Sequence, residues 1–305
     1  MVVLVTGANG QLGQAIQSIS GKYPEIDFVF CSSSYLDITN LENCQAVFST
    51  YQPHFCINTA AYTAVDKAES EPAKAFDINA NGAENLAITC KKFNTILIHI
   101  STDFVFDAYF SEGIAYYDRE LRLPLKSNLG LTETDVPFPS GVYGLTKLQG
   151  EQAIQANWDK HFIIRTSWVY SQFGNNFMKT MLRLASERDR LSVVADQIGT
   201  PTNAVDLAEV LIKIIVSCHA ELVSASNYGI YNFSNEGQCS WYDFAKEIFH
   251  QKGVSIDLKP IPTSAYPTPA KRPAYSVLDK TKIKRTFGVE IKEWQTSLAT
   301  CINQL

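Results

Sequence analysis

Residues 2–21 read VVLVTGANGQLGQAIQSISG, and the expected fold class follows from their pattern. The first six form an apolar run typical of a buried strand, and a helical pattern begins at Gln11. Glycines 7, 10 and 13 stand at the junction. Such glycines allow a sharp turn and a close approach to a pyrophosphate, while the helix start offers free N–H groups. We interpret the junction as a dinucleotide-binding turn; the alternative is a tight strand–helix turn with chance spacing.

Strand and helix patterns alternate through the first half of the chain. Further apolar strands are expected at residues 27–32, 55–61, 95–106 and 161–170, with helical segments between them. Continuous apolar strands separated by helices indicate a parallel sheet covered on both faces. We therefore predict an α/β fold whose doubly wound, Rossmann-type parallel sheet occupies residues 1–170.

The pattern changes after residue 170. Shorter strands and several helices precede a proline-rich stretch, KPIPTSAYPTPAKRPAYSVLD, at residues 259–279. We expect residues 171–305 to form mainly a smaller C-terminal α/β lobe that binds the substrate. A segment at about 203–234 is expected to return to the Rossmann domain.

Composition limits the possible partners. The chain has 305 residues, of which 46% are hydrophobic and 19% charged, and a net charge of −5, as a folded protein would have. No dense Lys/Arg run appears, so neither nucleic acid nor an anionic membrane is expected as a partner. No apolar run reaches the length of a membrane span, and the seven cysteines have no CxxC spacing, which favours buried thiols in a cytoplasmic protein.

The stretch SGVYGLTKLQGE, residues 140–151, carries candidate catalytic chemistry. Tyr143 and Lys147 are four positions apart and share a helix face. A phenol has a pKa of about 10, and a nearby ammonium lowers it so that the proton can move. Thr102 ends the fourth expected strand, where sites on doubly wound sheets form, and would hold a substrate oxygen beside Tyr143. The alternative is an exposed surface pair.

The GxxGxxG spacing and the YxxxK pair resemble the extended branch of the short-chain dehydrogenase/reductase superfamily. Longer strings are similar to the dTDP-4-dehydrorhamnose reductase family, in order along the whole chain: TAAYTAVDKAESEP (59–72), STDFVF (101–106), VYGLTKLQGE (142–151), RTSWVY (165–170), GNNFMKTMLRLA (174–185) and PTSAYPTPAKRPAYSVLD (262–279).

That resemblance implies NAD(P)H-dependent reduction of the C4 ketone of dTDP-4-dehydro-6-deoxy-L-mannose to dTDP-L-rhamnose, in cell-surface polysaccharide biosynthesis. It implies that the catalytic residues are Tyr143, Lys147 and Thr102. The cofactor would contact Tyr143 and Lys147 together with Gly7, Asn9, Gly10, Gln11, Leu12, Gly13, Asp37, Ile38, Ala60, Ala61 and Tyr62. The sugar nucleotide would contact Thr102, Asp103, Trp168, Asn176 and Arg272.

Several of these positions have a structural alternative. Asp37 also suits a cap of the following turn, and Ala60 suits strand–helix packing. A tryptophan after a buried strand, like Trp168, is usually part of a core. Arg272 suits a diphosphate because a guanidinium binds two oxygens at once, but it also suits a solvated surface. His99, in an expected strand, is interpreted as a hydrogen-bonded core residue.

The chain also departs from the family pattern. Ala15 stands where some members are reported to have a metal-holding glutamate, and the five histidines show no metal spacing, so we expect no metal. Serines 32–34 lie at the end of the second expected strand and favour NADPH over NADH. Residues 111–130 look like extra chain that would form a lid, a dimer contact or a neutral insertion. A homodimer is the assembly considered, although the sequence does not determine it.

Two other functions remain open on the sequence. A sugar-nucleotide epimerase or 4,6-dehydratase shares the superfamily, but a dehydratase needs an Asp-Glu pair after the threonine, and here Asp103-Phe104 follows Thr102. A non-catalytic regulatory subunit resembling that of methionine adenosyltransferase would keep the fold and the nucleotide. The intact Thr102, Tyr143 and Lys147 set favours an enzyme.

Overall fold

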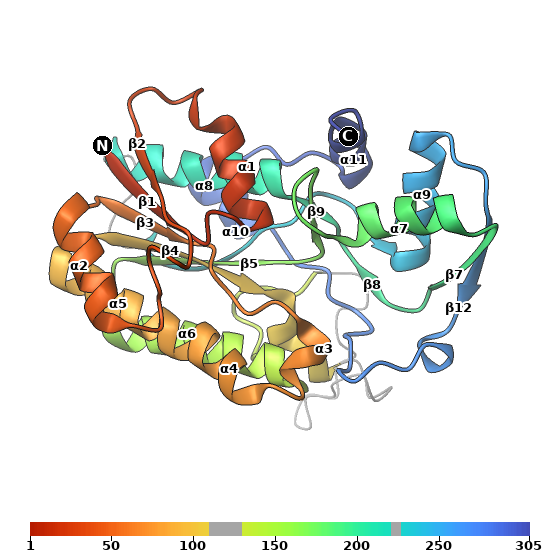
Figure 1. Cartoon of the computed structure of the whole chain (residues 1–305), viewed down its shortest axis with the longest axis horizontal. Coiled ribbons are helices and arrows are strands. Elements are labelled where there is room, and N and C mark those ends of the chain that lie inside the picture. The colour runs from red at the N-terminus through yellow and green to blue at the C-terminus, as the bar shows by residue number, and fades with distance from the viewer. Residues whose placement is uncertain (110–129, 221–226) are drawn as a thin grey trace.

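A six-stranded parallel sheet forms the centre of the molecule (Figure 1). The computed structural model describes residues 1–109, 130–220 and 227–305, so most of the extra chain at 111–130 lies outside the described residues. The strand order is β10-β5-β4-β3-β1-β2. The bounds are β1 (Val2–Thr6), β2 (Asp27–Phe30), β3 (Phe55–Asn58), β4 (Ile96–Thr102), β5 (His161–Thr166) and β10 (Gly229–Asn232).

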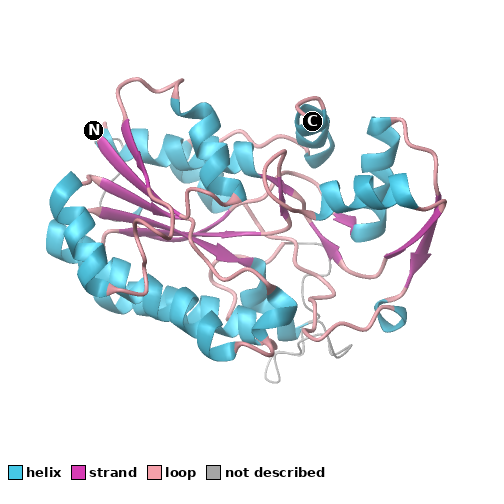
Figure 2. Ribbon diagram, in the orientation of Figure 1, coloured by secondary structure: helices cyan, strands magenta, loops and turns pink. Residues whose placement is uncertain are grey.

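Helices cover both faces of this sheet (Figure 2). One face carries α1 (Gln11–Ser20), α8 (Ala204–His219) and α10 (Thr281–Phe287). The other carries α2 (Leu41–Tyr51), α5 (Gly82–Phe93) and α6 (Val142–Asn157). Short helices lead from β3 into α5, and a 3-10 segment follows β4: α3 (Val65–Ala68), α4 (Pro72–Phe76), η1 (Asp77–Asn81) and η2 (Asp103–Tyr109).

The β1 strand shows why helices must pack on both faces of the sheet. Val3 and Val5 are buried in the core under α1 and α8, whereas Leu4 is buried in the core under α2 and α5. Successive strand residues point to opposite faces, so a continuous apolar run requires apolar packing on both. The predicted α/β fold with a doubly wound parallel sheet is confirmed.

The later part of the chain has a separate hydrophobic core that includes the aromatic residues Tyr170, Phe244 and Trp294. Its strands are short and pair two by two, β12 with β7, β11 with β8 and β6 with β9. The elements are β6 (Val169–Tyr170), α7 (Phe177–Glu187), β7 (Arg190–Val194), β8 (Ile198–Gly199), β9 (Thr202–Asn203), β11 (Cys239–Ser240), α9 (Trp241–Lys252), β12 (Asp257–Ile261), η4 (Thr263–Ala265) and α11 (Trp294–Ile302).

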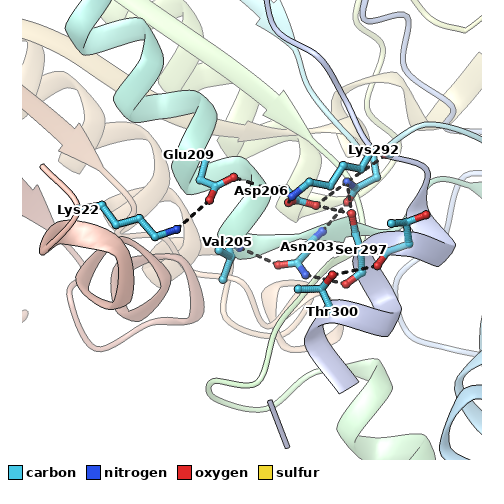
Figure 3. A network of polar contacts seen from close by, with 10 residues as sticks. Lys22, Asn203, Val205, Asp206, Glu209, Lys292, Ser297 and Thr300 are labelled. Carbon is cyan, nitrogen blue, oxygen red and sulfur yellow. Dashed lines mark hydrogen bonds and ion pairs between the residues drawn. The ribbon is translucent and has the colours of Figure 1, made fainter. Parts of the chain in front are cut away.

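Segment 203–234 contains α8, which packs against α1, and β10, which pairs with β5 in the main sheet. A polar network ties α8 to the C-terminal helix (Figure 3). Asp206 accepts hydrogen bonds from Ser297 of α11 and Lys292, and Lys22 after α1 forms an ion pair with Glu209. The domain limits at residues 170 and 203–234 stay a prediction. Within the described ranges, no helix has both the length and the apolar character needed to cross a bilayer.

The contact between α6 and η1 depends on Gly150. A Cβ atom there would lie 2.2 Å from the carbonyl oxygen of Asn79. We expect Gly150→Ala to lower the free energy of unfolding by about 1–3 kcal/mol, because overpacking moves the backbone. Urea denaturation measures this. Gly21→Ala is the control, since a Cβ at Gly21 meets nothing within 4 Å. Equal unfolding midpoints for the two variants would contradict the expectation.

Candidate active site

The turn between β1 and α1 is shaped as the glycine pattern predicts. Gly7 has a φ of +63°, and a Cβ there would lie 2.7 Å from the Ala60 amide nitrogen. At Gly13 a Cβ would lie 2.6 Å from the Gly7 carbonyl oxygen. Helix α1 begins after Gly10 with no side chain capping it and no acidic residue in its first turn. Its exposed N–H dipoles therefore fit a pyrophosphate, with the chain drawn close enough for contact.

Other expected cofactor residues lie around this turn at the ends of neighbouring strands. Asn9 is exposed, and Gln11 accepts hydrogen bonds from Ser171 and Asn176, which brings the later part of the chain to the turn. Ala60 is the second residue after β3, and its N–H is directed at Asn58 Oδ1 at 3.2 Å. The buried residues of this set are Leu12, Ile38 and Tyr62, while Ala61 is half-buried.

Asp37 caps the turn that follows it, which was the alternative to a cofactor contact. Its Oδ1 accepts hydrogen bonds from the N–H and the hydroxyl of Thr39 at 3.0 and 2.8 Å. Asp37 is exposed, as are Ser33 and Ser34, which follow β2. Ser32 and Ser34 hydroxyl oxygens lie 2.8 Å apart. Asp37 thus stabilises its own turn, and the serine cluster is open to solvent at the same edge.

Tyr143 and Lys147 lie in the first turns of α6, next to the end of β4. The Tyr143 ring packs edge-on against Phe104 with centroids 5.5 Å apart. The Thr102 hydroxyl lies close enough to the Tyr143 phenol to lower the pKa of that phenol. The Thr102 hydroxyl also lies 3.1 Å from Asp103 Oδ1 and accepts from the Phe104 N–H. The threonine and tyrosine that the sequence singled out therefore meet at the carboxyl edge of the sheet.

The pKa of Tyr143 differs from the expectation. Burial raises the Tyr143 pKa to about 12, the nearby Thr102 hydroxyl opposes that rise, and the Asp103 charge adds to it. Lys147 is not among its causes, because its amino group is bound to β4, donating to the Ile100 carbonyl at 2.7 Å. The predicted lowering of the Tyr143 pKa by Lys147 is thus wrong for this structure. Burial lowers the Lys147 pKa to about 8, against the raising effect of Glu151.

A buried ion pair holds helix α6 against the sheet. Arg165 on β5 donates through Nη2 to Glu151 Oε2 at 2.6 Å and through Nε to Oε1 at 3.0 Å. Ser101 of β4 donates to the same carboxylate. Both ionic side chains are at most 2% exposed. Glu151 is one helical turn beyond Lys147, so this pair fixes α6 against β4 and β5 at the level of the site.

Trp168 adopts a backbone conformation that is unusual for a bulky residue, with a φ of +47°. Its indole stacks on Trp241 of α9 with ring centroids 3.6 Å apart and planes 10° from parallel. A Cβ at Gly199 would lie 2.6 Å from the Trp168 ring, so this contact requires glycine. Trp168 is half-buried, so the stack joins the aromatic core while leaving part of the indole accessible.

The remaining expected substrate residues are held by the protein itself. Asn176 is the N-cap of α7, accepting from the Lys179 N–H while donating to Gln11. Arg272 donates through Nη1 and Nη2 to the two carboxylate oxygens of Asp66, each at 2.7 Å. Asp103 is buried next to Thr102. The Asp66–Arg272 pair joins α3 to the proline-rich loop, and the Arg272 side chain is 24% exposed.

Sequence reasoning assigned no role to three residues that shape this region, Asn58, Asp66 and Trp241. Asn58 lies in hydrogen-bond contact with His99, Asp66 holds Arg272, and Trp241 stacks on Trp168. His99 is a buried, hydrogen-bonded core residue, as the sequence predicted, and its Nε2 lies 3.1 Å from the Lys147 amino nitrogen. Asp66 lies inside the string 59–72 that carried the resemblance, which was its available signal. Asn58 and Trp241 match no motif.

The family is decided by a match over the full chain. The family model described as "RmlD substrate binding domain" matches residues 1–305. The chain belongs to this RmlD family. A curated relative, dTDP-4-dehydrorhamnose reductase of Aggregatibacter actinomycetemcomitans, is 41% identical over 97% of this chain and 96% of its own length.

Solved structures of dTDP-4-dehydrorhamnose reductases are similar to this chain over its whole length. A dTDP-4-dehydrorhamnose reductase from Clostridium acetobutylicum is 40% identical with a TM-score of 0.88, covering 100% of this chain and 99% of its own. One from Bacillus anthracis, described in complex with NADP, is 38% identical with a TM-score of 0.87, covering 100% and 99%. The resemblance found in the sequence is therefore confirmed.

Proposed function

We propose that this RmlD-family protein reduces the C4 ketone of dTDP-4-dehydro-6-deoxy-L-mannose to give dTDP-L-rhamnose, a precursor for cell-surface polysaccharide. One observation carries the proposal: Thr102 meets the Tyr143 phenol at the sheet edge where the glycine turn opens. The reductase names of relatives that are 38–41% identical over nearly the whole chain support it.

Each residue has a distinct part in the proposed reaction. Thr102 holds the ketone oxygen, and Tyr143 gives its phenolic proton to the oxygen as negative charge develops there. A phenol whose pKa is raised stays protonated at neutral pH, and an alkoxide is basic enough to take its proton. Lys147, in its ammonium form, binds the ribose of the nicotinamide cofactor. The reduced nicotinamide, when bound, supplies the hydride.

The cofactor and substrate surfaces complete the proposal. The turn at Gly7, Gly10 and Gly13 would hold the pyrophosphate, and the exposed serines after β2 would hydrogen-bond a 2′-phosphate, which favours NADPH. Trp168, Asn176 and Arg272 would contact the sugar nucleotide, with Asp103 beside Thr102. The Bacillus anthracis relative described with NADP supports this choice. A cytosolic location and a homodimer are also part of the proposal.

Activity should decline above about pH 8. The ammonium of Lys147 is the useful form, and its pKa is lowered to about 8. A lysine with a lowered pKa is charged below that value and loses its charge as the pH rises through it. Above this pKa, we expect kcat/KM for the ketosugar to fall about tenfold for each pH unit. A rate that stays level to pH 10 would contradict the role of Lys147.

The deciding experiment follows absorbance of the reduced nicotinamide. Purified protein is mixed with NADPH or NADH and enzymatically made dTDP-4-dehydro-L-rhamnose. Oxidation that requires the ketosugar and is faster with NADPH supports the proposal. Faster turnover with NADH would overturn the cofactor preference alone. No oxidation by folded, cofactor-binding protein would favour a non-catalytic nucleotide-binding subunit, and turnover of another sugar nucleotide would favour a related reductase or epimerase.

A further inference from the structure

Lys147 is connected to the glycine turn by a row of buried polar side chains. Thr6, Asn58 and His99 are paired in register across β1, β3 and β4. Asn58 and His99 are each 1% exposed, and Thr6 is fully buried. His99 Nε2 lies 3.1 Å from the amino nitrogen of Lys147, which is also 1% exposed. The row therefore runs from the residue before Gly7 to the amino group of Lys147.

The orientation of the Asn58 amide is set by the Ala60 N–H, which can only donate and lies 3.2 Å from Asn58 Oδ1 and 3.3 Å from Thr6 Oγ1. The Thr6 hydroxyl, which can donate or accept, donates in this orientation to Asn58 Oδ1 at 2.6 Å. The amide nitrogen of Asn58 therefore faces His99 and lies 2.9 Å from its Nδ1. Because an amide nitrogen only donates, Nδ1 of His99 must accept, and a neutral imidazole then carries its proton on Nε2.

This tautomer has a consequence for Lys147. An Nε2–H can only donate, so the nitrogen of Lys147 opposite it must accept, which an uncharged amine can do and an ammonium cannot. One N–H of that amine donates to the Ile100 carbonyl at 2.7 Å. The arrangement seen here is therefore complementary to the uncharged form of Lys147.

We propose that His99 is a positioning residue whose tautomer, selected by Asn58, is linked to the charge of Lys147. When Lys147 is an ammonium, His99 must accept at Nε2, carry its proton on Nδ1 and donate to Asn58, whose amide turns over. One proton is taken up overall, and the imidazole keeps one proton in both states. The turned amide loses the Ala60 N–H contact, so Asn58 favours the uncharged lysine.

The surrounding charges are consistent with a neutral imidazole. Burial and the charges of Lys147 and His161 hold the His99 pKa well below its usual range. Lys147 faces Glu151, itself paired with Arg165, and Tyr143 next to Asp103 lies one helical turn before it. The functional consequence rests on the proposed reductase activity: the Asn58–His99 pair would set the highest pH at which Lys147 keeps the charge that the reaction needs.

The tautomer can be observed directly by nitrogen NMR of [15N]histidine-labelled protein without substrate, from pH 6 to 9.5. We expect His99 to carry its proton on Nδ1 at low pH and on Nε2 at high pH. The midpoint of this change should fall at the pH where kcat/KM has dropped to half. His161 is an internal reference, because its Nδ1 lies against the Trp158 carbonyl and must keep its proton throughout. His99→Gln assigns the signals. One unchanged His99 tautomer over this range, or an imidazolium at pH 6, overturns the proposal.

A variant tests the link to activity. Asn58→Asp offers His99 a carboxylate acceptor, which keeps the Nδ1–H tautomer and lets Lys147 stay charged to higher pH. We expect the alkaline limb of kcat/KM to move up by about one pH unit, the equivalent of one hydrogen bond. Asn203→Asp is the matched control, since Asn203 is also buried and caps α8 far along the chain. An unmoved limb in Asn58→Asp, or an equal shift in the control, overturns the link.

The two proposals fail separately. A protein that shows the His99 switch but does not reduce the ketosugar retains this inference and loses the proposed function. A protein that reduces the ketosugar with a fixed His99 tautomer retains the function and loses this inference.

Discussion

Tyr143→Phe lowers kcat for ketosugar reduction by about 10²–10⁴-fold, the range found for removing a general acid. Phenylalanine keeps the ring that packs against Phe104 and lacks the hydroxyl that Thr102 contacts. The loss should therefore appear in kcat, with cofactor affinity and the unfolding midpoint close to those of the parent protein. Steady-state absorbance assays with a cofactor titration measure both.

The control is Tyr23→Phe, which removes a phenol from the segment after α1, away from the sheet edge that carries Tyr143. We expect it to retain parental activity. A Tyr143→Phe protein that keeps more than about a tenth of the parental kcat would mean that another group supplies the proton. A large loss in cofactor affinity instead of kcat would assign Tyr143 to binding.

Glu151→Ala should lower the free energy of unfolding by about 3–5 kcal/mol, because it leaves the Arg165 guanidinium buried without its partner. That side chain is 2% exposed and its Nη2 lies 2.6 Å from the carboxylate. Urea denaturation of the parent and the variant gives the difference.

Two further variants separate the effect of burial on stability from the effect of charge. The exposed pair of Arg183 and Glu187 has a similar contact distance, 3.0 Å, with side chains 60% and 49% exposed. Glu187→Ala should therefore cost about 0–1 kcal/mol. Arg165→Met combined with Glu151→Leu should recover most of the stability that Glu151→Ala loses, since apolar residues of similar size often replace a buried pair. Equal losses in Glu151→Ala and Glu187→Ala would contradict this account.

Local sequence patterns were sufficient to predict the parallel sheet, the glycine turn and the helix that carries Tyr143 and Lys147. The apolar runs of β1 to β5 and the glycines at 7, 10 and 13 act through backbone geometry and periodicity, which neighbouring residues determine. The four-residue spacing of Tyr143 and Lys147 placed both on α6 for the same reason. Thr102 was found because strand ends of a parallel sheet meet at one edge.

The partners of those residues depended on tertiary contact. Arg272 was predicted to face a diphosphate, and its contact with Asp66, 206 positions away in the chain, exists only once the proline-rich loop packs on α3. The stacking of Trp168 on Trp241 likewise needs the backbone turn at Trp168 and the space at Gly199. No spacing rule connects such pairs, because their separation is set by the fold.

The protonation chemistry shows the same division. The sequence by itself determined that a phenol and an amine share a helix face near a nucleotide turn. Whether that amine lowers the pKa of the phenol was decided by the folded chain, in which β4 binds the amino group of Lys147 and burial raises the pKa of Tyr143. Desolvation and hydrogen bonding act through space over a few ångströms, so side chains from β3, β4 and α6 set these pKa values together.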